Sequence, residues 1–352
     1  MQRVATELND VLQARDDLVV HSIVLRSSWK WIHVNVLRFL SSLAIRLERE
    51  ALAFRADGIL FTSMMSALPL LVAGSGLKKR GVRLGAIAHG LDAIDPNPAY
   101  QAALRQLRAP IDVVMPVSRA TGEELVARGW PPHKVQVVPN GIDLARFKGI
   151  AALRQAAHSP EIRGGPPWPE DAFLLVAVGR QVRRKGFAWF IEDVMPKLPA
   201  RVHLWLVGDG PERRKIAAAI RRHGLENRVQ CLGRISESEL VEVYRHGQLF
   251  VMPNIVVPGD MEGFGIVMLE AGACGLPVLG ADIEGIRDVI REGVNGWFAP
   301  SGDADAFSER ILSLSNNPAE LRAATQRSAA YVANKFSREK AAERYLQLLR
   351  MC

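Results

Sequence analysis

The most informative stretch of the sequence is Glu262-Gly263-Phe264-Gly265-Ile266-Val267-Met268-Leu269-Glu270. It follows a loop rich in Pro and Gly, residues 253–260. A glycine-rich turn lets backbone N–H groups approach a ligand closely, and the helix that follows directs its positive end toward that ligand. Glu262 and Glu270 lie two helical turns apart, so their carboxylates can hold hydroxyl groups at two places on an extended ligand. The alternative is a capping glutamate followed by a surface glutamate.

On both sides of this stretch, short β-branched runs alternate with helical patterns. The predicted strands are residues 18–25, 58–62, 83–89, 113–117, 173–178, 202–207, 229–232, 249–252 and 277–280. The predicted helices are residues 1–14, 35–54, 121–128, 213–223, 236–244, 264–273, 304–314 and 338–350. This alternation predicts an α/β fold with parallel sheets covered on both faces, arranged as two Rossmann-like domains.

The boundary between the two domains is marked by residues 158–170, where the density of Pro and Gly excludes a regular element. The length of 352 residues also favours two domains. The predicted organisation is a first domain, a linker, a second domain and a terminal helix that packs outside the second domain, over residues 1–145, 146–170, 171–335 and 336–352.

Composition narrows the class of protein. Hydrophobic residues make up 48% and charged residues 23%, as in soluble enzymes. No apolar run is long enough to span a membrane. Three isolated cysteines exclude a disulfide framework and a zinc ribbon and indicate the cytoplasm. The net charge of +8 has no basic tail, so nucleic acid is not an expected partner, whereas anionic ligands or a membrane surface are compatible with it.

A basic stretch follows the predicted strand 173–178: Gly179-Arg180-Gln181-Val182-Arg183-Arg184-Lys185-Gly186. An Arg at the carboxyl end of a strand faces the crevice where such sheets bind ligands. The planar guanidinium of Arg180 and the ammonium of Lys185 can bind a diphosphate and stabilise it as a leaving group. The alternative is a solvated basic loop, and we assign Arg183 and Arg184 to such a solvated face.

A third candidate is His89, in Ala86-Ile87-Ala88-His89-Gly90-Leu91-Asp92. It ends a predicted strand of the first domain, again at the edge where ligands bind. We interpret His89 as a functional residue, with a structural histidine as the alternative.

Together these stretches resemble the retaining, nucleotide-sugar-dependent glycosyltransferases of GT-B fold, specifically family 4. The resemblance covers residues 84–335 and is most specific in the second domain. Three further stretches match the family: Pro139-Asn140-Gly141-Ile142-Asp143 with Phe147, Val207-Gly208-Asp209-Gly210-Pro211, and Cys231-Leu232-Gly233-Arg234-Ile235. The implied fold is GT-B, with two Rossmann-like domains that face a central cleft. The first would be the acceptor side and the second would bind the nucleotide sugar.

The resemblance also implies roles for individual residues. Arg180 and Lys185 would hold the donor diphosphate, Glu270 the ribose hydroxyls, and Ile235 would border the nucleobase. His89 would reach the sugar near the reacting carbon. The transferred sugar and its phosphate would be bound by Glu262 and by the backbone of Gly263, Phe264, Gly265 and Ile266. Neither a metal ion nor a cofactor is expected, because the basic pair can supply the charge stabilisation that a metal would give.

One departure from the family pattern is at the start of the chain. Family members begin with a strand and a Gly-Gly loop, followed by residues similar to Gln2-Arg3-Val4-Ala5. We therefore expect the first strand of the pattern to lie before residue 1. The alternative is a fold that simply starts with a helix.

The first domain also carries a basic amphipathic pattern. Trp29-Lys30-Trp31 precedes apolar and basic positions at Val34, Leu37, Arg38, Leu40, Leu43, Ile45, Arg46 and Arg49. Such a helix can lie on an anionic leaflet with Trp at the headgroup level. The alternative is an ordinary helix whose apolar stripe packs on the sheet.

The predicted function is metal-independent, retaining transfer of a hexose-type sugar (class EC 2.4) to a glycan or lipid-linked acceptor, in the cytoplasm or at the inner face of the membrane. Polysaccharide biosynthesis for the cell envelope is the expected context. The alternatives are another GT-B enzyme, a sugar-nucleotide epimerase or a phosphorylase, and a non-catalytic nucleotide-binding member that lacks the Gly-Gly loop. The residues after Ile235 do not distinguish uridine from guanosine.

Overall fold

The computed structural model describes residues 2–25, 32–153 and 171–351. The chain divides into two compact units, one formed by Met1–Gly141 with Arg338–Cys352 and the other by Ile142–Ser337. Helix α15 (Arg338–Met351) therefore follows the second unit in sequence but belongs to the first. Residues 29–31, at the start of the predicted amphipathic helix, lie outside the described residues.

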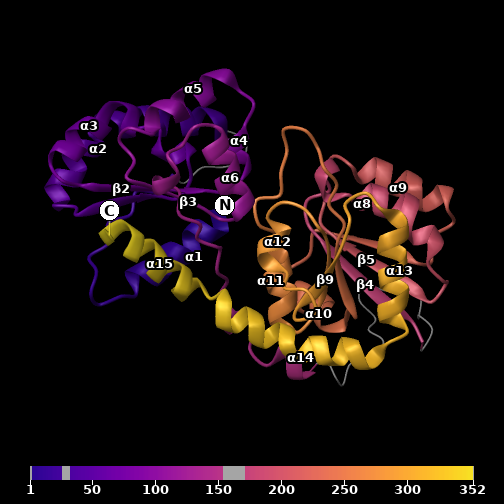
Figure 1. Ribbon diagram of the computed structural model, residues 1–352. Helices are drawn as coiled ribbons and strands as arrows, with labels where there is room; N and C mark the ends of the chain where they lie inside the picture. The colour runs from indigo at the N-terminus through magenta and orange to yellow at the C-terminus, as the bar shows by residue number, and fades with distance from the viewer. Residues whose placement is uncertain (1, 26–31, 154–170, 352) are drawn as a thin grey trace. The chain divides into compact units, whose positions relative to one another are not determined.

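The first unit is built on a parallel sheet of order β1-β2-β3. Its helices lie on both faces of the sheet, with α1 and α15 on one side and α2, α3, α5 and α6 on the other (Figure 1). Gly85 in β2 allows α15 to approach, because a Cβ atom there would lie 2.8 Å from Leu349 Cδ2. The elements before α15 are β1 (Gly58–Phe61), β2 (Arg83–Ala88), β3 (Val113–Pro116), α1 (Gln2–Gln13), α2 (Ile32–Phe54), α3 (Leu70–Lys79), α4 (Leu91–Ile94), α5 (Pro98–Leu107), α6 (Arg119–Ala127), η2 (Met65–Ala67) and η3 (Pro132–Lys134).

The strand predicted at residues 18–25 is wrong. The segment has no regular secondary structure, and the side chain of Val19 is 85% exposed. A β-branched run becomes a strand only where a neighbouring strand accepts its backbone hydrogen bonds, and no described strand pairs with this segment.

The second unit contains a six-stranded parallel sheet of order β6-β5-β4-β7-β8-β9. Along the chain, β4, β5 and β6 are added in one direction across the sheet. Strands β7, β8 and β9 are then added in the other direction, so the strand order reverses between β4 and β7. The strands are β4 (Phe173–Val178), β5 (Val202–Val207), β6 (Val229–Gly233), β7 (Leu249–Met252), β8 (Val278–Ala281) and β9 (Gly296–Ala299). This arrangement confirms the predicted α/β class.

Helices cover both faces of this sheet. Helices α9 and α13 pack with η7, whereas α10 contacts β4 and α11 contacts β7, β8 and α14 (Figure 1). The helices and turns are η4 (Leu144–Phe147), α7 (Ile150–Leu153), η6 (Arg183–Lys185), α8 (Phe187–Trp189), η7 (Phe190–Val194), η8 (Met195–Lys197), α9 (Arg213–Arg222), α10 (Glu237–His246), α11 (Ile266–Ala273), α12 (Ile286–Val289), α13 (Ala304–Ser315) and α14 (Pro318–Lys335).

Burial explains why these strands could be recognised. Every residue of β4, β5, β7 and β8 is buried, as expected for parallel strands that have helices on both faces. Because the strands are parallel, the loops that follow them all leave the same edge of the sheet, and these loops can carry a binding site.

Candidate active site

The candidate site lies where the strand order reverses, between β4 and β7. In an open parallel sheet this point leaves a crevice at the carboxyl ends of the strands. The turn after β4 packs closely on the loop after β7 at Gly186, where φ is +67° and an added Cβ would lie 1.8 Å from the carbonyl oxygen of Pro253. Only glycine fits at this position, so the basic turn and the acidic loop are held together.

A buried ion cluster joins these two loops. The Lys185 ammonium lies 2.5 Å from Oε2 of Glu262, and Nη1 of Arg184 lies 3.0 Å from the same oxygen. Nε of Arg184 also contacts Oδ1 of Asp260 at 2.9 Å. The side-chain amide of Asn254 donates to Glu262 at 3.2 Å. Three side chains, those of Lys185, Arg184 and Asn254, therefore bind the same carboxylate oxygen of Glu262.

The electrostatics of the cluster favour an ionised Glu262. Burial by itself raises the pKa of this carboxyl, but the charges of Lys185 and Arg184 and the hydrogen bonds from Lys185 and Asn254 bring the pKa below its ordinary value. Lys185 and Glu262 are each only 7% exposed. The pair is thus a fixed, desolvated arrangement of charge between the loops that follow β4 and β7.

The cluster corrects the prediction for Arg184, which was assigned to a solvated face. Its side chain is 17% exposed and bonds to both Asp260 and Glu262. The reason is the tight turn η6, which directs Arg184 and Lys185 inward while Arg183 remains exposed. Arg180 is exposed at the end of β4, and its guanidinium group makes no hydrogen bond or ion pair with any described residue. It is available to an anionic ligand.

The glycine-rich stretch opens helix α11 as predicted, but two residues later than expected. Gly265 adopts φ +82°, the left-handed conformation, and the helix begins at Ile266. Helix α11 leaves its first N–H groups without partners inside the helix, and these can serve a ligand. The ring of Phe264 is 3% exposed and packs against Phe336, so this residue offers only its backbone.

Glu270 lies inside α11, away from the ion cluster. Its side chain is 2% exposed, and Oε2 accepts a hydrogen bond from the hydroxyl of Tyr244 at 3.0 Å. Ile235 is half-buried in the loop after β6, next to Ser236, which caps α10. Glu262, Glu270 and Ile235 all belong to the second unit.

His89 lies in the first unit, at the carboxyl end of β2. Its Nε2 lies 2.9 Å from the carbonyl oxygen of Thr62. A carbonyl can only accept, so Nε2 carries the proton and Nδ1 is the acceptor nitrogen of the neutral ring. Burial lowers the pKa of His89, and the opposing charge of Asp92 is a smaller effect. The histidine is therefore neutral near pH 7.

Asp92 holds the backbone around this histidine. Its Oδ1 accepts the His89 N–H at 2.6 Å, and its Oδ2 accepts the Met64 N–H at 3.1 Å. Asp92 thus ties the ends of β1 and β2 together. Its position three residues after His89, at the start of a short helix, was a signal that the sequence offered.

Other residues of the site were not predicted from the sequence. Asn254 and Asp260 lie in the loop that precedes Glu262, and Glu284 follows β8 and accepts the Glu262 N–H at 2.6 Å. The end of a neighbouring parallel strand is where such a residue is expected, so the predicted strand at 277–280 was the available signal for Glu284.

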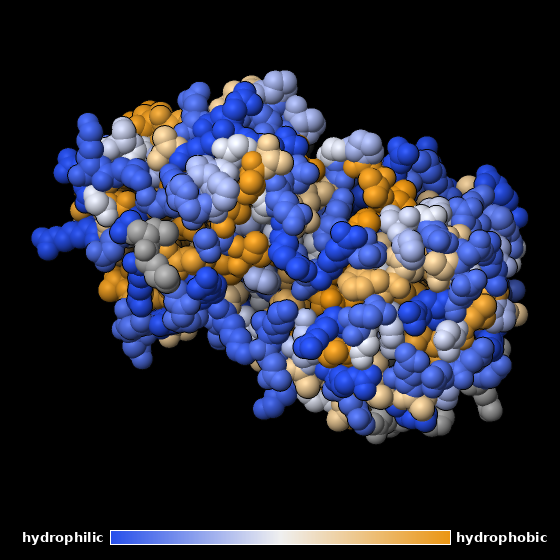
Figure 2. Space-filling model, viewed as in Figure 1, coloured by the Kyte–Doolittle hydropathy of each residue, from blue (hydrophilic) through white to orange (hydrophobic). Residues whose placement is uncertain are grey.

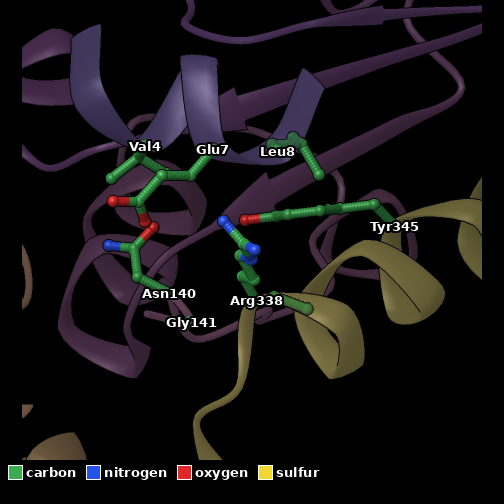
Figure 3. Close-up of a pocket in the computed structure, with 8 residues that line it drawn as sticks. Val4, Glu7, Leu8, Asn140, Gly141, Arg338 and Tyr345 are labelled. Atoms are coloured by element: carbon green, nitrogen blue, oxygen red, sulfur yellow. The ribbon is translucent and has the colours of Figure 1, made fainter. Parts of the chain in front are cut away.

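Two cavities among the described residues lie away from this cluster. One of about 10 Å³, the size of a single water molecule, lies between α1, α15 and the 140–141 segment. Figure 3 shows Glu7 directed at Asn140, and Arg338 and Tyr345 directed at each other. A larger cavity of about 350 Å³ is lined by Leu144, Ala145, Phe147, Lys148, Gly149, Ala151, Ala273, Ala329 and Ala333. Neither includes a predicted site residue.

Nowhere in the described ranges do three His, Cys, Asp or Glu side chains group in a way that could hold a metal ion. Among the helices of the same residues, none has the length and apolar character needed to cross a bilayer.

Comparison with known proteins gives the family. Residues 158–331 match the family model described as Glycosyl transferases group 1, and residues 4–146 match the model for Glycosyltransferase Family 4. The chain belongs to the group 1 glycosyltransferases. The resemblance based on residues 262–270 and on the basic stretch after β4 is thereby confirmed.

Two relatives of this chain are named as glycosyltransferases. The amylovoran biosynthesis glycosyltransferase AmsK of Erwinia amylovora is 28% identical over 247 residues, which cover 69% of this chain and 57% of AmsK. A GDP-mannose-dependent alpha-(1-6)-phosphatidylinositol monomannoside mannosyltransferase of Mycolicibacterium smegmatis is 29% identical, with 72% of this chain and 66% of the relative covered. The chain thus spans less than two thirds of the length of either relative.

Solved structures give the same fold. HepE of Anabaena in complex with UDP-glucose has a TM-score of 0.71 and 19% identity, covering 94% of this chain and 86% of HepE. Sucrose-phosphate synthase of Thermosynechococcus elongatus has a TM-score of 0.73 and 21% identity, covering 100% of this chain and 93% of the synthase. At these identities the likeness is one of fold, and the fold is the GT-B arrangement of two Rossmann-like domains.

Proposed function

We propose that this protein is a metal-independent, retaining glycosyltransferase that moves a hexose-type sugar from a nucleoside-diphosphate sugar to a glycan or lipid-linked acceptor. The observation that carries the proposal is the buried cluster of Glu262 with Lys185 and Arg184 at the point where the strand order reverses. The exposed Arg180 at the end of β4 supplies a cation at the same edge of the sheet.

The donor class follows from the charges that meet there. Arg180 offers a planar fork for phosphate oxygens, and Lys185 lies one short turn away. The first N–H groups of α11 supply further donors to an anion. A UDP-glucose complex of HepE and a GDP-mannose-dependent relative support a nucleotide sugar as the donor class, and they name two different bases.

The proposed chemistry is attack on the same face of the sugar that the leaving group departs from. The bond between the anomeric carbon and the diphosphate oxygen breaks as the acceptor hydroxyl forms its new bond, and the departing phosphate takes the hydroxyl proton. Arg180 and Lys185 stabilise the charge that develops on the diphosphate. The role of His89, to stabilise positive charge at the anomeric carbon, remains a prediction of the family resemblance.

The acceptor side has an apolar and basic surface on α2. The side chains of Leu37 and Ile45 are 69% and 84% exposed, and Arg38 and Arg49 are exposed on the same helix. The opposite face of α2 is buried, at Leu43, Leu47 and Ala51. Figure 2 shows apolar surface over the part of the first unit where Figure 1 draws α2 and α3. This face supports contact with an anionic membrane and a lipid-linked acceptor in cell-envelope polysaccharide assembly.

Membrane contact is tested by flotation with vesicles. Binding to vesicles that contain phosphatidylglycerol, and not to phosphatidylcholine alone, is the expected result. A Leu37→Ser, Ile45→Ser variant should lose this binding, whereas Val126→Ser, at an exposed apolar residue of α6, should keep it. Equal binding by the wild type and both variants would show that α2 does not contact the membrane.

The proposed reaction is tested with a panel of nucleotide sugars and NMR of the products. Transfer or slow hydrolysis of at least one donor, with the anomeric configuration kept and activity unchanged by a chelator, is expected. An epimerase would release a free sugar with a changed ring hydroxyl, and a phosphorylase would require inorganic phosphate. A member that only binds nucleotide would show saturable binding with no turnover of any donor.

A further inference from the structure

Glu284 is held in an unusual conformation beside the proposed sugar loop. Its φ is +48°, in the left-handed region that non-glycine residues seldom adopt. The next residue, Gly285, packs so closely on that loop that an added Cβ would lie 2.2 Å from the carbonyl oxygen of Gly263. Residues 284 and 285 therefore pack directly against the backbone of Glu262 and Gly263.

The carboxylate of Glu284 is directed at the same loop. Its Oε2 accepts the backbone N–H of Glu262 at 2.6 Å. Its other oxygen makes no hydrogen bond with any described residue, and the side chain is half-buried. One carboxylate oxygen thus fixes the loop while the second remains available where a sugar would bind.

The charges of this corner do not balance. Arg184 and Lys185 face the carboxylates of Asp260, Glu262 and Glu284, so two positive charges meet three negative ones. Burial raises the pKa of Glu284, and the neighbouring charge of Glu262 raises it further. In its ionised form Glu284 would meet a carboxylate on the bound sugar with a like charge.

A second, independent observation indicates that this corner holds a ligand. Asn254 is 1% exposed, and its Nδ2 donates to Glu262 at 3.2 Å, which places its amide inside the cluster. The Oδ1 atom of the same amide is buried and has no hydrogen-bond partner among the described residues. A buried carbonyl oxygen of this kind matches a hydroxyl or ammonium donor and rejects a carboxylate.

We propose that Glu284 is a specificity-determining residue that excludes donors whose sugar carries a carboxylate and admits neutral or amino sugars. The inference rests on the proposed function and deepens it. Discrimination of this kind works by an unfavourable contact with the wrong ligand, here like charges at close range. Arg180 lies outside the excess negative corner, so the donor diphosphate is still attracted to the site.

The test compares donors that differ only in this carboxylate, such as UDP-glucose with UDP-glucuronate and GDP-mannose with GDP-mannuronate. Glu284→Gln keeps an oxygen that can accept the Glu262 N–H and removes the charge. The ratio of kcat/KM for the carboxylated donor to kcat/KM for the neutral donor should rise about tenfold in this variant. The matched control is Glu226→Gln, which removes an exposed charge just before β6, at the opposite end of the strands, and should leave the ratio unchanged.

The possible outcomes separate this inference from the proposed function. A wild-type protein that turns over neutral donors, together with an unchanged ratio in Glu284→Gln, overturns the inference and leaves the function standing. Equal use of both donors by the wild type also overturns it. Failure of the wild type with every donor refutes the function itself. If Glu284→Gln does not fold, Glu284→Gly, which suits a positive φ, gives the same comparison.

Discussion

Replacing Lys185 with methionine tests the buried cluster most severely, because it removes the ammonium and keeps the length of the side chain. Removing one partner of a buried ion pair costs about 3–5 kcal/mol when the remaining charge has no other partner. Here Glu262 keeps Arg184 at 3.0 Å and Asn254 at 3.2 Å. We therefore expect a loss near the lower limit, about 2–3 kcal/mol in the free energy of unfolding.

The measurement is urea unfolding followed by tryptophan fluorescence at pH 7, for Lys185→Met, Glu262→Gln and the double variant. The double variant should recover stability relative to the sum of the single variants, by a coupling energy of about 1–3 kcal/mol. Arg183→Met removes an exposed charge from the same turn and should change stability by less than about 0.5 kcal/mol. A Lys185→Met protein as stable as the wild type, with additive effects in the double variant, would refute the reasoning.

The pH dependence of the same unfolding curves has a defined sign. Although burial alone raises the pKa of Glu262, its cationic neighbours bring the folded-state pKa below the ordinary value. Its ionisation therefore stabilises the fold above the unfolded pKa of about 4.3, and this contribution is lost as the pH falls through the folded pKa. In Lys185→Met the loss should begin at a higher pH. If the free energy of unfolding falls over the same acid pH range in both proteins, this account is contradicted.

Two other variants have expected effects on stability. Asp92→Asn should destabilise the first unit by about 1–3 kcal/mol, because one of the two carboxylate oxygens that accept the His89 and Met64 N–H groups becomes an amide donor; hydrogen exchange at those two amides measures it, and unchanged protection would argue against this role. Tyr244→Phe should lower the stability of the second unit by about 1–2 kcal/mol, since it removes the hydroxyl that donates to Glu270; a thermal melt that matches the wild type would contradict this expectation.

The strands of the second unit could be predicted from the sequence because their apolar runs are continuous. The bounds of β4, β5 and β7 match the predicted ranges, since strands buried on both faces need no polar alternation. Strand β9 was missed because it begins with Gly296, a residue that is uncommon in strands. The error at residues 18–25 has the opposite cause: propensity was high, but a strand also requires a partner.

The site could be predicted only where its residues are close in sequence. Arg180 and Lys185 follow one strand and Glu262 precedes one helix, so local pattern identified them as candidates. The inward direction of Arg184 depends on the tight turn η6, which a run of three basic residues does not specify. Glu284 joins the site because β8 lies beside β7 in the sheet, and the sequence around a predicted strand does not specify its neighbours.

The most direct measurement is calorimetric titration of the wild-type protein with UDP, GDP, ADP and dTDP, repeated with Arg180→Ala. Arg214→Ala, which removes an exposed cation from α9, is the matched control. At least one diphosphate should bind the wild type, and its Kd should rise about tenfold to a hundredfold in Arg180→Ala, as expected for loss of a charge-assisted hydrogen bond. Arg214→Ala should bind as the wild type does. Absence of binding to all four nucleotides, or equal affinity in Arg180→Ala, would contradict a donor site at the end of β4.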